Sequence, residues 1–295
     1  MPNYTTITII YNPKSTGNGL QLAKELKDKL AEQEPKSDVS LVATKHAGHA
    51  EELAYEHAMA SKRPLIISAS GDGGYHEVIN GVLKAKKDGA NAVTGLLPAG
   101  NANDHYNELH DTDIVKSIVE HREQLIDILS LSTKIDNKQL QRYGHSYIGL
   151  GLTPEAGREL NKTQLNWINQ ITIVLRVLLF LRPVAISVAG KTRHYDSLIF
   201  SNISTTSKVL TIAKESSAND GQFEVTSFRR RNKLKLISSL LHSSTIGLKG
   251  GEKMNQYTFN TIKPTLVQID GEIITIDANT KTQISIEHQA LTCII

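Results

Sequence analysis

The segment PLIISASGDGG at residues 64–74 decides the fold, because an apolar run is followed directly by a glycine-rich turn. The run Pro64–Ala69 is short and apolar, which predicts a strand buried on both faces. Glycines in the turn let main-chain N–H groups approach an anion, and the helix expected over Val78–Lys87 would add the positive end of its dipole. Asp72 would repel a phosphate, so its expected use is to hold Mg²⁺ beside one. A plain glycine turn with a capping aspartate explains the segment equally well.

Strands and helices alternate through the first 100 residues. Short β-branched runs predict strands, and leucines and alanines at helical spacing predict helices. The expected strands are Thr6–Tyr11, Val39–Thr44, Pro64–Ala69 and Val93–Leu97, and the expected helices are Leu20–Ala31, His49–Ser61 and Val78–Lys87. This alternation predicts a helix-flanked parallel sheet, so residues 1–128 are expected to form an α/β domain.

The pattern changes near Leu129, after which short strand-like segments predominate. Two helical stretches interrupt them, at residues 164–181 and 233–243. The expected strands are Ser146–Leu150, Val184–Val188, Leu198–Ser201, Phe223–Phe228, Thr265–Asp270, Glu272–Ile276 and Gln283–Glu287. We therefore predict an α/β + β fold class, in which residues 129–287 form a mainly antiparallel β-sandwich. The last strand, about residues 288–295, is expected to return to the first domain, and a ligand cleft is expected between the domains.

Composition excludes several classes of protein. The chain has 295 residues, a net charge of +3 and a single cysteine, Cys293, so a disulfide framework is excluded and a reducing compartment is expected. The longest apolar stretch, residues 171–188, contains two arginines and a proline and does not predict a membrane span. No signal peptide is evident at the start. The mild charge requires no nucleic acid, and we expect a cytoplasmic protein that can also bind peripherally to a membrane.

A second polar motif also follows a strand. Residues 97–104 read LPAGNAND and come directly after the expected strand Val93–Leu97. Loops at the carboxyl ends of parallel strands lie on one edge of the sheet, so Asp72, Asp104 and Asn12 are expected to converge there. A helix cap is the simpler explanation for Asp104 taken alone. Neither a Walker-type loop nor a complete dinucleotide fingerprint occurs in the chain.

Taken in order, the motifs resemble the diacylglycerol kinase catalytic-domain family. The resemblance is to the bacterial soluble lipid kinases, which are related to sphingosine kinases and more distantly to NAD kinases. It covers essentially the whole chain. The residues that carry it are Tyr11 to Ser15, Thr44, Gly71-Asp72-Gly73, Glu77 to Gly81, Leu97 to Asp104, Ile126-Asp127, Ala218 to Gly221 and Ile269 to Glu272.

The resemblance implies roles for individual residues. The residues expected to contact ATP are Asn12, Pro13, Lys14, Ser15, Thr16, Thr44, Gly71, Asp72, Gly73, Gly74, Tyr75, His76, Glu77 and Asn101. The residues expected to hold the catalytic magnesium are Asp72, Asp104 and Asp127. A separate structural magnesium site is implied at Asp220, together with backbone carbonyls near Ser217 and Gln222. Glu272, beside Asp270, matches the family's proton acceptor, although an exposed hairpin with two solvated acids is the simpler explanation of Asp270-Gly271-Glu272.

The chain departs from the family pattern in both loops. The family loop usually reads Gly-Gly-Asp-Gly-Thr, whereas Ser70 stands at its first position here and Gly74 at its last. In the second motif Asn101 replaces a threonine, and His105-Tyr106-Asn107 replaces the usual ending. Two hydroxyls that would face the nucleotide are therefore missing, which leaves weak ATP binding or a changed phosphate donor open.

The resemblance implies an ATP- and Mg²⁺-dependent lipid kinase that phosphorylates a lipid hydroxyl, with diacylglycerol as the default substrate. The alternatives are a catalytically weakened or non-catalytic lipid- or nucleotide-binding homologue, and a kinase of soluble substrates like the NAD kinases. Relatives suggest a homodimer and a lipid substrate met at the membrane surface. The basic run at residues 228–235 could contact anionic headgroups, or could equally be a solvated loop. The apolar stretch at residues 167–181 is expected to be a core or dimer helix, and the alternative is that it lines the acyl-chain entry or bridges the two domains. The scattered histidines are assigned no chemistry.

Overall fold

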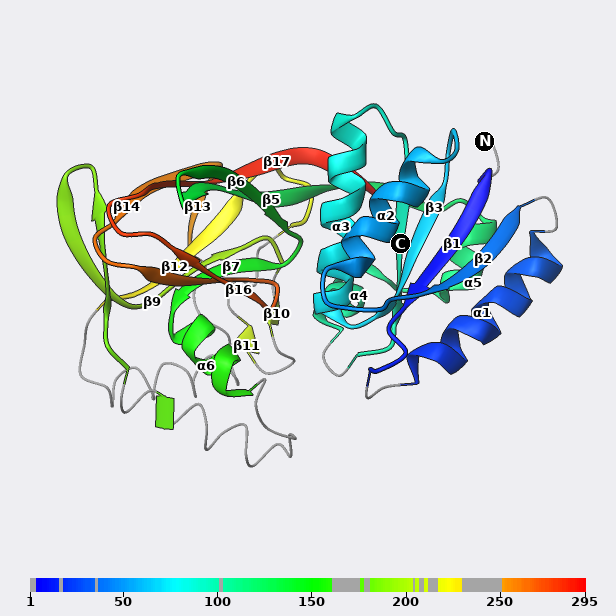
Figure 1. The fold of residues 1–295 in the computed structure, drawn as a ribbon, viewed down its shortest axis with the longest axis horizontal. Helices are drawn as coiled ribbons and strands as arrows, with labels where there is room; N and C mark the ends of the chain where they lie inside the picture. The colour runs from blue at the N-terminus through cyan, green and yellow to red at the C-terminus, as the bar shows by residue number, and fades with distance from the viewer. Residues whose placement is uncertain are drawn as a thin grey trace. The chain divides into compact units, whose positions relative to one another are not determined.

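The computed structural model describes residues 4–15, 18–34, 37–100, 103–160, 176–177, 181–203, 205–206, 210–211, 217–229 and 251–295. Contacts divide the chain into two compact units (Figure 1). The first unit is Met1–Asp127 with Gln289–Ile295, and the second is Ile128–His288. The α/β + β fold class predicted from the sequence is confirmed.

The first unit contains a parallel sheet with the strand order β17-β4-β3-β1-β2. These strands are β1 (Thr6–Tyr11), β2 (Asp38–Ala43), β3 (Leu65–Ser70), β4 (Val93–Pro98) and the end of β17 (Lys281–Ile294), where Cys293 pairs with Thr94. The helices are α1 (Gly19–Gln33), α2 (His49–Met59), α3 (Asp72–Lys87), α4 (Asp104–Leu109) and α5 (Ile114–Val119). Side chains of β3 and β4 are buried on both faces, as expected for strands covered by helices on either side.

Helix α1 shows why these residues form this layer. Its buried residues are Gly19, Ala23, Leu26 and Leu30, which recur at three- and four-residue spacing. They join an apolar core with Ile7, Ile9, Leu65 and Ile67 from the sheet. The lysines between them stay on the solvent side, so the binary pattern of the sequence positions the helix.

Helix α3 begins at Asp72, which corrects an expectation. The sequence predicted a loop through Gly74 and a helix from Val78, but Asp72, Gly73 and Gly74 form the first turn of α3. Gly71 is the last residue in extended geometry, with φ −88° and ψ −173°. Adjacent glycines have low helix propensity, so local pattern alone does not place them inside a helix. The glycine-rich segment is therefore a helix N-terminus rather than a long loop.

The second unit is an antiparallel β structure. Strand β9 (Lys191–Ser201) pairs with β7 (Tyr147–Gly151), β8 (Val184–Val188) and β12 (Phe223–Arg229). The other strands are β6 (Lys138–Gly144), β10 (Thr205–Thr206), β11 (Leu210–Thr211), β13 (Glu252–Met254), β14 (Gln256–Thr261), β15 (Thr265–Ile269), β16 (Glu272–Ile276), and parts of β5 (Glu123–Ile135) and β17. Helix α6 (Leu152–Leu160) follows β7. The core contains Phe200, Phe223, Phe259, Ile269 and Leu198.

Several sequence expectations fall outside the described residues. Thr16 and Asn101 are among them, as are the helix expected at residues 233–243 and most of the one expected at residues 164–181. The basic run is described only as far as Arg229. Within the described part, no helix is both long enough and apolar enough to cross a membrane.

Candidate functional site

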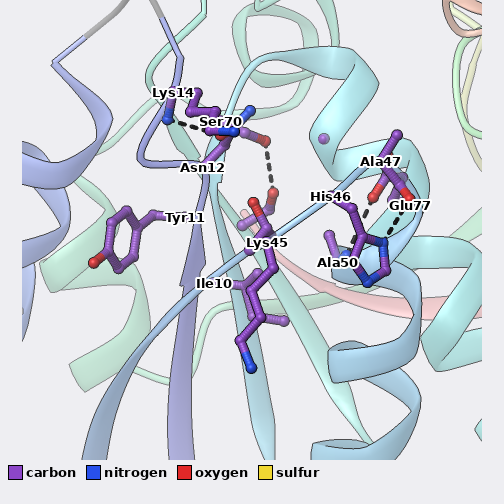
Figure 2. A pocket seen from close by; sticks show the side chains of 13 residues that line it. Ile10, Tyr11, Asn12, Lys14, Lys45, His46, Ala47, Ala50, Ser70 and Glu77 are labelled. Carbon is purple, nitrogen blue, oxygen red and sulfur yellow. Dashed lines mark hydrogen bonds between the residues drawn. The ribbon is translucent and has the colours of Figure 1, made fainter.

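An open pocket of about 380 Å³ lies in the first unit, where β1, β2 and β3 end (Figure 2). Ile10 and Tyr11 belong to the end of β1, Ser68 and Ser70 to the end of β3, and Gly74 to the first turn of α3. The remaining lining residues are Asn12, Lys14, Thr44, Lys45, His46, Ala47, Ala50 and Glu77. The pocket therefore occupies the carboxyl edge of the parallel sheet, where ligands of α/β folds bind.

The pocket brings together several residues that the sequence predicted as nucleotide contacts. Asn12, Lys14, Thr44, Gly74 and Glu77 line it. Asn12 is held in a tight turn, because its Oδ1 accepts the main-chain N–H of Lys14 at 2.9 Å. The N–H of Thr44 donates to the carbonyl of Tyr11 at 2.9 Å, which fixes the end of β2 against the end of β1.

The positive charges of the pocket were not predicted as a group. Lys14 and Lys45 are both exposed and both line the pocket, and His46 lies beside them. Glu77 is the one acidic residue among the lining residues, so the two lysines leave the lining with a net positive charge. Such a lining favours an anionic ligand. The sequence did not predict Lys45 as a pocket residue, because it follows the end of a strand in a segment that contains no recognisable motif.

Glu77 anchors the segment that carries Lys45 and His46. Its Oε1 accepts the N–H of Gly48 at 3.1 Å, and its Oε2 accepts the N–H of Ala50 at 3.2 Å. These donors lie at the start of α2, where main-chain N–H groups lack partners within the helix. The carboxylate thus acts as a remote cap of α2. A direct nucleotide contact of Glu77 stays a prediction.

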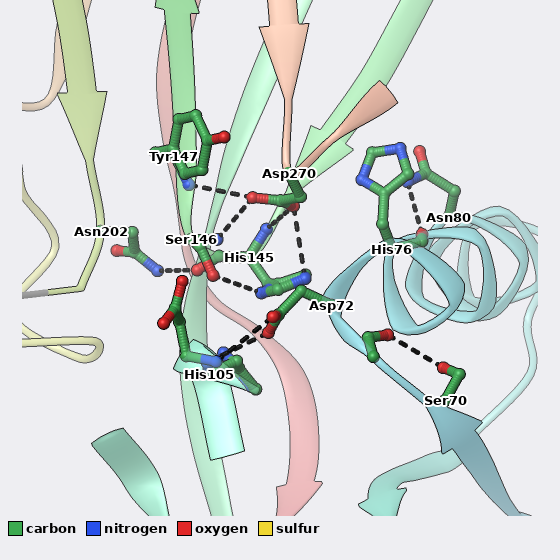
Figure 3. A network of polar contacts seen from close by, with 12 residues as sticks. Ser70, Asp72, His76, Asn80, His105, His145, Ser146, Tyr147, Asn202 and Asp270 are labelled. Carbon is green, nitrogen blue, oxygen red and sulfur yellow. Dashed lines mark hydrogen bonds and ion pairs between the residues drawn. The ribbon is translucent and has the colours of Figure 1, made fainter. Parts of the chain in front are cut away.

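Asp72 connects the two polar motifs (Figure 3). Its Oδ2 accepts the N–H of Asp104 at 3.2 Å, and its Oδ1 accepts the N–H of His105 at 3.2 Å. The two loops also touch through their backbones, since a Cβ on Gly100 would lie 2.3 Å from the Cα of Gly71. Asn103, in left-handed geometry, bonds with both the N–H and the carbonyl of Gly100. Asp72 and Asp104 are thereby brought to one place at the sheet edge.

The other predicted residues of this unit are more deeply placed. Asp127 is fully buried, and its Oδ1 accepts the N–H of Gln289 at 2.7 Å. The side chains of Tyr75 and His76 are buried, so they face the core rather than the pocket. The Tyr75 hydroxyl lies 3.1 Å from Thr94 Oγ1 and 3.2 Å from Cys293 Sγ, and burial raises its pKa. Four other predicted contacts do not line the pocket: Pro13 and Ser15 after β1, Gly71 at the N-cap of α3, and Gly73 in its first turn.

Two histidines beside the pocket form a cluster that the sequence did not reveal. Ligand atoms of His46, His49 and Glu52 lie within 4.8 Å of one another. However, Nδ1 of His49 accepts the N–H of Lys45 at 3.0 Å, which places the ring proton on Nε2. That nitrogen therefore has no lone pair to give to a metal, and we assign no metal to the cluster.

In the second unit, Asp270 organises a turn (Figure 3). Its carboxylate accepts the N–H groups of His145 at 2.6 Å, Ser146 at 2.9 Å and Tyr147 at 2.9 Å. Asp270 itself has φ 47°, and its side chain is fully buried. The carboxylate of Asp270 therefore holds the turn that leads into β7, and a catalytic role for it stays a prediction.

Glu272 lies two residues further on and is paired with a residue that the sequence did not single out. Its Oε2 accepts from Nε of Arg142 at 3.0 Å and from Nη2 at 2.8 Å. The guanidinium stabilises the ionised carboxylate and fixes its orientation. The sequence did not predict this role of Arg142, because an arginine in a polar strand cannot be told from an ordinary solvent-exposed basic residue.

The residues expected to hold a structural magnesium do not fit that ion as arranged. Asp220 Oδ2 accepts from Nζ of Lys253 at 2.8 Å, and the same Nζ lies 3.7 Å from the buried Glu224. Asp220 Oδ1 accepts the N–H of Gln222 at 3.0 Å, while Ser217 donates to Asn219 at 2.7 Å. An ammonium group already neutralises the carboxylate that would bind the metal.

The part of the chain that contains the pocket is similar to a known protein family. Residues 6–131 match the family model described as the diacylglycerol kinase catalytic domain. This segment, a little under half of the chain, is therefore similar to that family. It contains the whole pocket, together with Asp72, Asp104 and Asp127.

Two curated relatives carry the same description. The chain is 32% identical over 132 residues to a diacylglycerol kinase of Staphylococcus carnosus, a match that spans 43% of this chain and 41% of that protein. It is 33% identical over 137 residues to a diacylglycerol kinase of Staphylococcus aureus, which spans 46% and 40%. The matched region is thus less than half of either relative.

Solved structures extend the similarity of fold to the full chain. A diacylglycerol kinase from Bacillus anthracis has a TM-score of 0.74 to this chain, with 17% identity over 100% of this chain and 98% of the other. A second structure, of a putative diacylglycerol kinase from the same organism, has a TM-score of 0.72. At this identity the comparison shows a shared fold, including that of the diacylglycerol kinase catalytic domain and the β-rich unit.

Proposed function

We propose that this protein is a kinase that transfers the γ-phosphate of ATP to a lipid hydroxyl, with diacylglycerol as acceptor and phosphatidic acid as product. The observation that carries the proposal is the cationic pocket at the sheet edge, which lies inside the segment that is similar to the diacylglycerol kinase catalytic-domain family. The names of the curated relatives support the choice of acceptor.

Three features of the pocket suit a nucleoside triphosphate. Lys14 and Lys45 supply positive charge at the rim. The N-terminus of α3 adds main-chain N–H groups and the positive end of a 16-residue helix dipole. Glu77 keeps the segment with Lys45 in place by capping α2, so the charge that meets the phosphates is positioned before binding.

The donor set at Asp72 and Asp104 fits a magnesium ion. Carboxylate oxygens are the hard ligands that Mg²⁺ prefers, and two half-buried aspartates are brought together where the polar motifs meet. Asp127, buried against Gln289, would support them from β5. A bound Mg²⁺ would neutralise charge that develops on the transferring phosphoryl group.

The acceptor hydroxyl needs a group that removes its proton, and we assign this role to Glu272. Arg142 holds that carboxylate in one orientation, and a carboxylate that is positioned within hydrogen-bond reach of the acceptor hydroxyl can take its proton. Asp270 acts through the turn that it holds at residues 145–147. The acid pair predicted from the sequence is thereby divided into a base and a positioning residue.

Transfer of labelled phosphate from ATP to diacylglycerol in mixed micelles tests the proposal. We expect wild type to be active and Glu272→Gln to lose at least about a hundredfold in rate, within the range for removal of a general base. Asp72→Asn should also lose activity, because it removes a proposed magnesium ligand. Glu32→Gln, an exposed carboxylate on α1, is the matched control and should retain full rate. Thermal unfolding of each variant separates lost chemistry from lost fold. Wild type that binds Mg-ATP but phosphorylates no lipid would refute the proposal of a lipid kinase, and an assay with NAD as acceptor would then separate a kinase of soluble substrates from a non-catalytic homologue.

Two finer expectations follow from the same proposal. The acceptor would be met at a membrane surface, so activity should rise when vesicles contain anionic lipid. We also expect a homodimer, which sedimentation of the full chain would measure.

A further inference from the structure

Ser70 and Gly74 compete for one space in the pocket wall. A Cβ added to Gly74 would lie 2.4 Å from Oγ of Ser70 and 2.6 Å from its Cβ. Both distances are far below normal contact, and the obstacle includes the serine Cβ rather than only a flexible tip. The two positions therefore cannot both carry a side chain without a shift of β3 against α3.

The space is specific to position 74. A Cβ added to the neighbouring Gly73 would meet nothing within 4 Å, because that residue faces solvent. Gly74 thus lacks a side chain because of the serine, and not because the helix turn itself demands glycine.

The Ser70 hydroxyl makes bonds that it can exchange at low cost. Its Oγ donates to the carbonyl of Gly71 at 2.9 Å and lies 2.7 Å from Oγ of the buried Ser68. Because a hydroxyl has one proton, Ser68 is then the donor between the two serines. The Gly71 carbonyl also accepts the N–H groups of Gly74 and Tyr75, each at 3.1 Å. A carbonyl oxygen has two lone pairs, so the serine bond is dispensable to Gly71.

We propose that Ser70 is a nucleotide-binding residue of this pocket, whose hydroxyl turns from the Gly71 carbonyl to a phosphate oxygen, and that it replaces a hydroxyl otherwise carried at position 74. This inference rests on the proposed function, because it names a group that contacts the same nucleotide. Ser68 supports the exchange, since its own proton keeps the second lone pair of Ser70 occupied and leaves the Ser70 proton for the ligand. The two departures from the family loop are then linked, because the hydroxyl gained at Ser70 replaces the one lost at Gly74.

Four variants test separately the steric clash between positions 70 and 74 and the contribution of the Ser70 hydroxyl to nucleotide binding. Ser70→Ala removes the hydroxyl but keeps the Cβ, and Gly74→Ala creates the clash. Ser70→Gly with Gly74→Ala relieves the clash without a hydroxyl. Ser70→Gly with Gly74→Thr relieves it and supplies a hydroxyl from the helix side. Ser61→Ala, at the other end of the β3 region and bonded to Thr5 and Thr6, is the serine control.

Thermal unfolding without nucleotide reads the steric part. We expect Gly74→Ala to lower the midpoint by roughly 4 °C, as overpacking of a tight site does, and the Ser70→Gly partner to restore it. Gly73→Ala should not lower it. A Gly74→Ala protein as stable as wild type would overturn the inference.

Calorimetric titration with Mg-ATP reads the binding part. We expect Ser70→Ala and the Ser70→Gly/Gly74→Ala pair to bind about tenfold more weakly, as loss of a hydrogen bond to a charged group implies, and Ser70→Gly/Gly74→Thr to recover most of the affinity. Wild-type affinity in Ser70→Ala would overturn this inference alone. A wild-type protein that binds no Mg-ATP at millimolar concentration would overturn the proposed function and this inference together.

Discussion

Replacing Glu77 with alanine removes the carboxylate that holds the start of α2 beside the pocket. The wild-type side chain accepts two main-chain N–H groups, at 3.1 Å from Gly48 and 3.2 Å from Ala50. A hydrogen bond to a charged group contributes about 1.5–3 kcal/mol, and each is weakened here because the site is open to water, which can satisfy the released donors. We therefore expect the free energy of opening at the start of α2 to fall by roughly 2 kcal/mol.

Amide hydrogen exchange followed by mass spectrometry measures this local free energy. A loss of about 2 kcal/mol corresponds to roughly thirtyfold faster exchange at the start of α2. Glu77→Gln should show about half of the loss in free energy, because one amide oxygen remains while the amide nitrogen faces a donor. Glu56→Ala, an exposed glutamate in the middle of α2, is the control and should exchange as wild type. The affinity for Mg-ATP should fall in Glu77→Ala, since Lys45 and His46 lie in the released segment. Unchanged exchange at Gly48 to Ala50 would refute the reasoning.

Three further predictions address other parts of the molecule. Mg²⁺ should raise the melting temperature of Lys253→Met more than that of wild type, because in wild type the Lys253 ammonium lies 2.8 Å from Asp220 and competes with the ion. Equal stabilisation of both proteins would contradict the description of this site. Arg142→Lys should lower kcat about tenfold without changing the KM for ATP, because one ammonium nitrogen cannot replace the two guanidinium nitrogens that both donate to Oε2 of Glu272. An unchanged kcat would count against Glu272 as the base. Cys293 should resist iodoacetamide at pH 8 until denaturant is added, because burial raises its pKa to about 11. At that pKa about one thiol in a thousand is ionised at pH 8, and the thiolate is the reactive form. Stoichiometric labelling of the native protein would contradict this prediction.

The sheet of the first unit was predictable because its signal is local. The expected strand Thr6–Tyr11 is β1 without change, and the expected strand at Pro64–Ala69 differs from β3 by one residue at each end. Both are short β-branched runs bounded by turn residues, and burial on both faces requires that composition. The convergence of Asp72 and Asp104 was predictable for a related reason, since the topology of a parallel sheet alone places strand ends on one edge.

The features that escaped prediction depend on tertiary structure. The start of α3 at Asp72 is stabilised by the contact of Gly71 with Gly100, which lies in another loop. The hairpin of β5 and β6 was missed because its polar second strand, with exposed residues such as Lys138 and Gln139, lacks an alternating apolar pattern. The pairing of Arg142 with a carboxylate 130 positions later has no local signal at all.

The candidate acids share a property that bears on every experiment proposed for them. Asp72 and Asp270, assigned here to magnesium and to positioning, both accept main-chain N–H groups of a neighbouring segment. Glu77 does the same for α2. A carboxylate that holds a loop also decides where that loop's other groups lie, so removing it disturbs geometry and charge together. Loss of activity after alanine substitution would therefore not separate chemistry from positioning.

Isosteric amides separate the two roles, because they keep one acceptor and most of the shape while removing the charge. For a metal-binding acid such as Asp72, the amide should abolish phosphate transfer while the melting temperature falls less, because the side chain is only half-buried and water can satisfy the N–H group that would face the amide donor. For a positioning acid such as Asp270, the amide should lower the melting temperature, because the side chain is buried and one of its N–H partners would face an amide donor. The opposite pattern, with a stable but inactive Asp270→Asn protein, would show that Asp270 contacts the reacting groups and that its three main-chain bonds are secondary to catalysis.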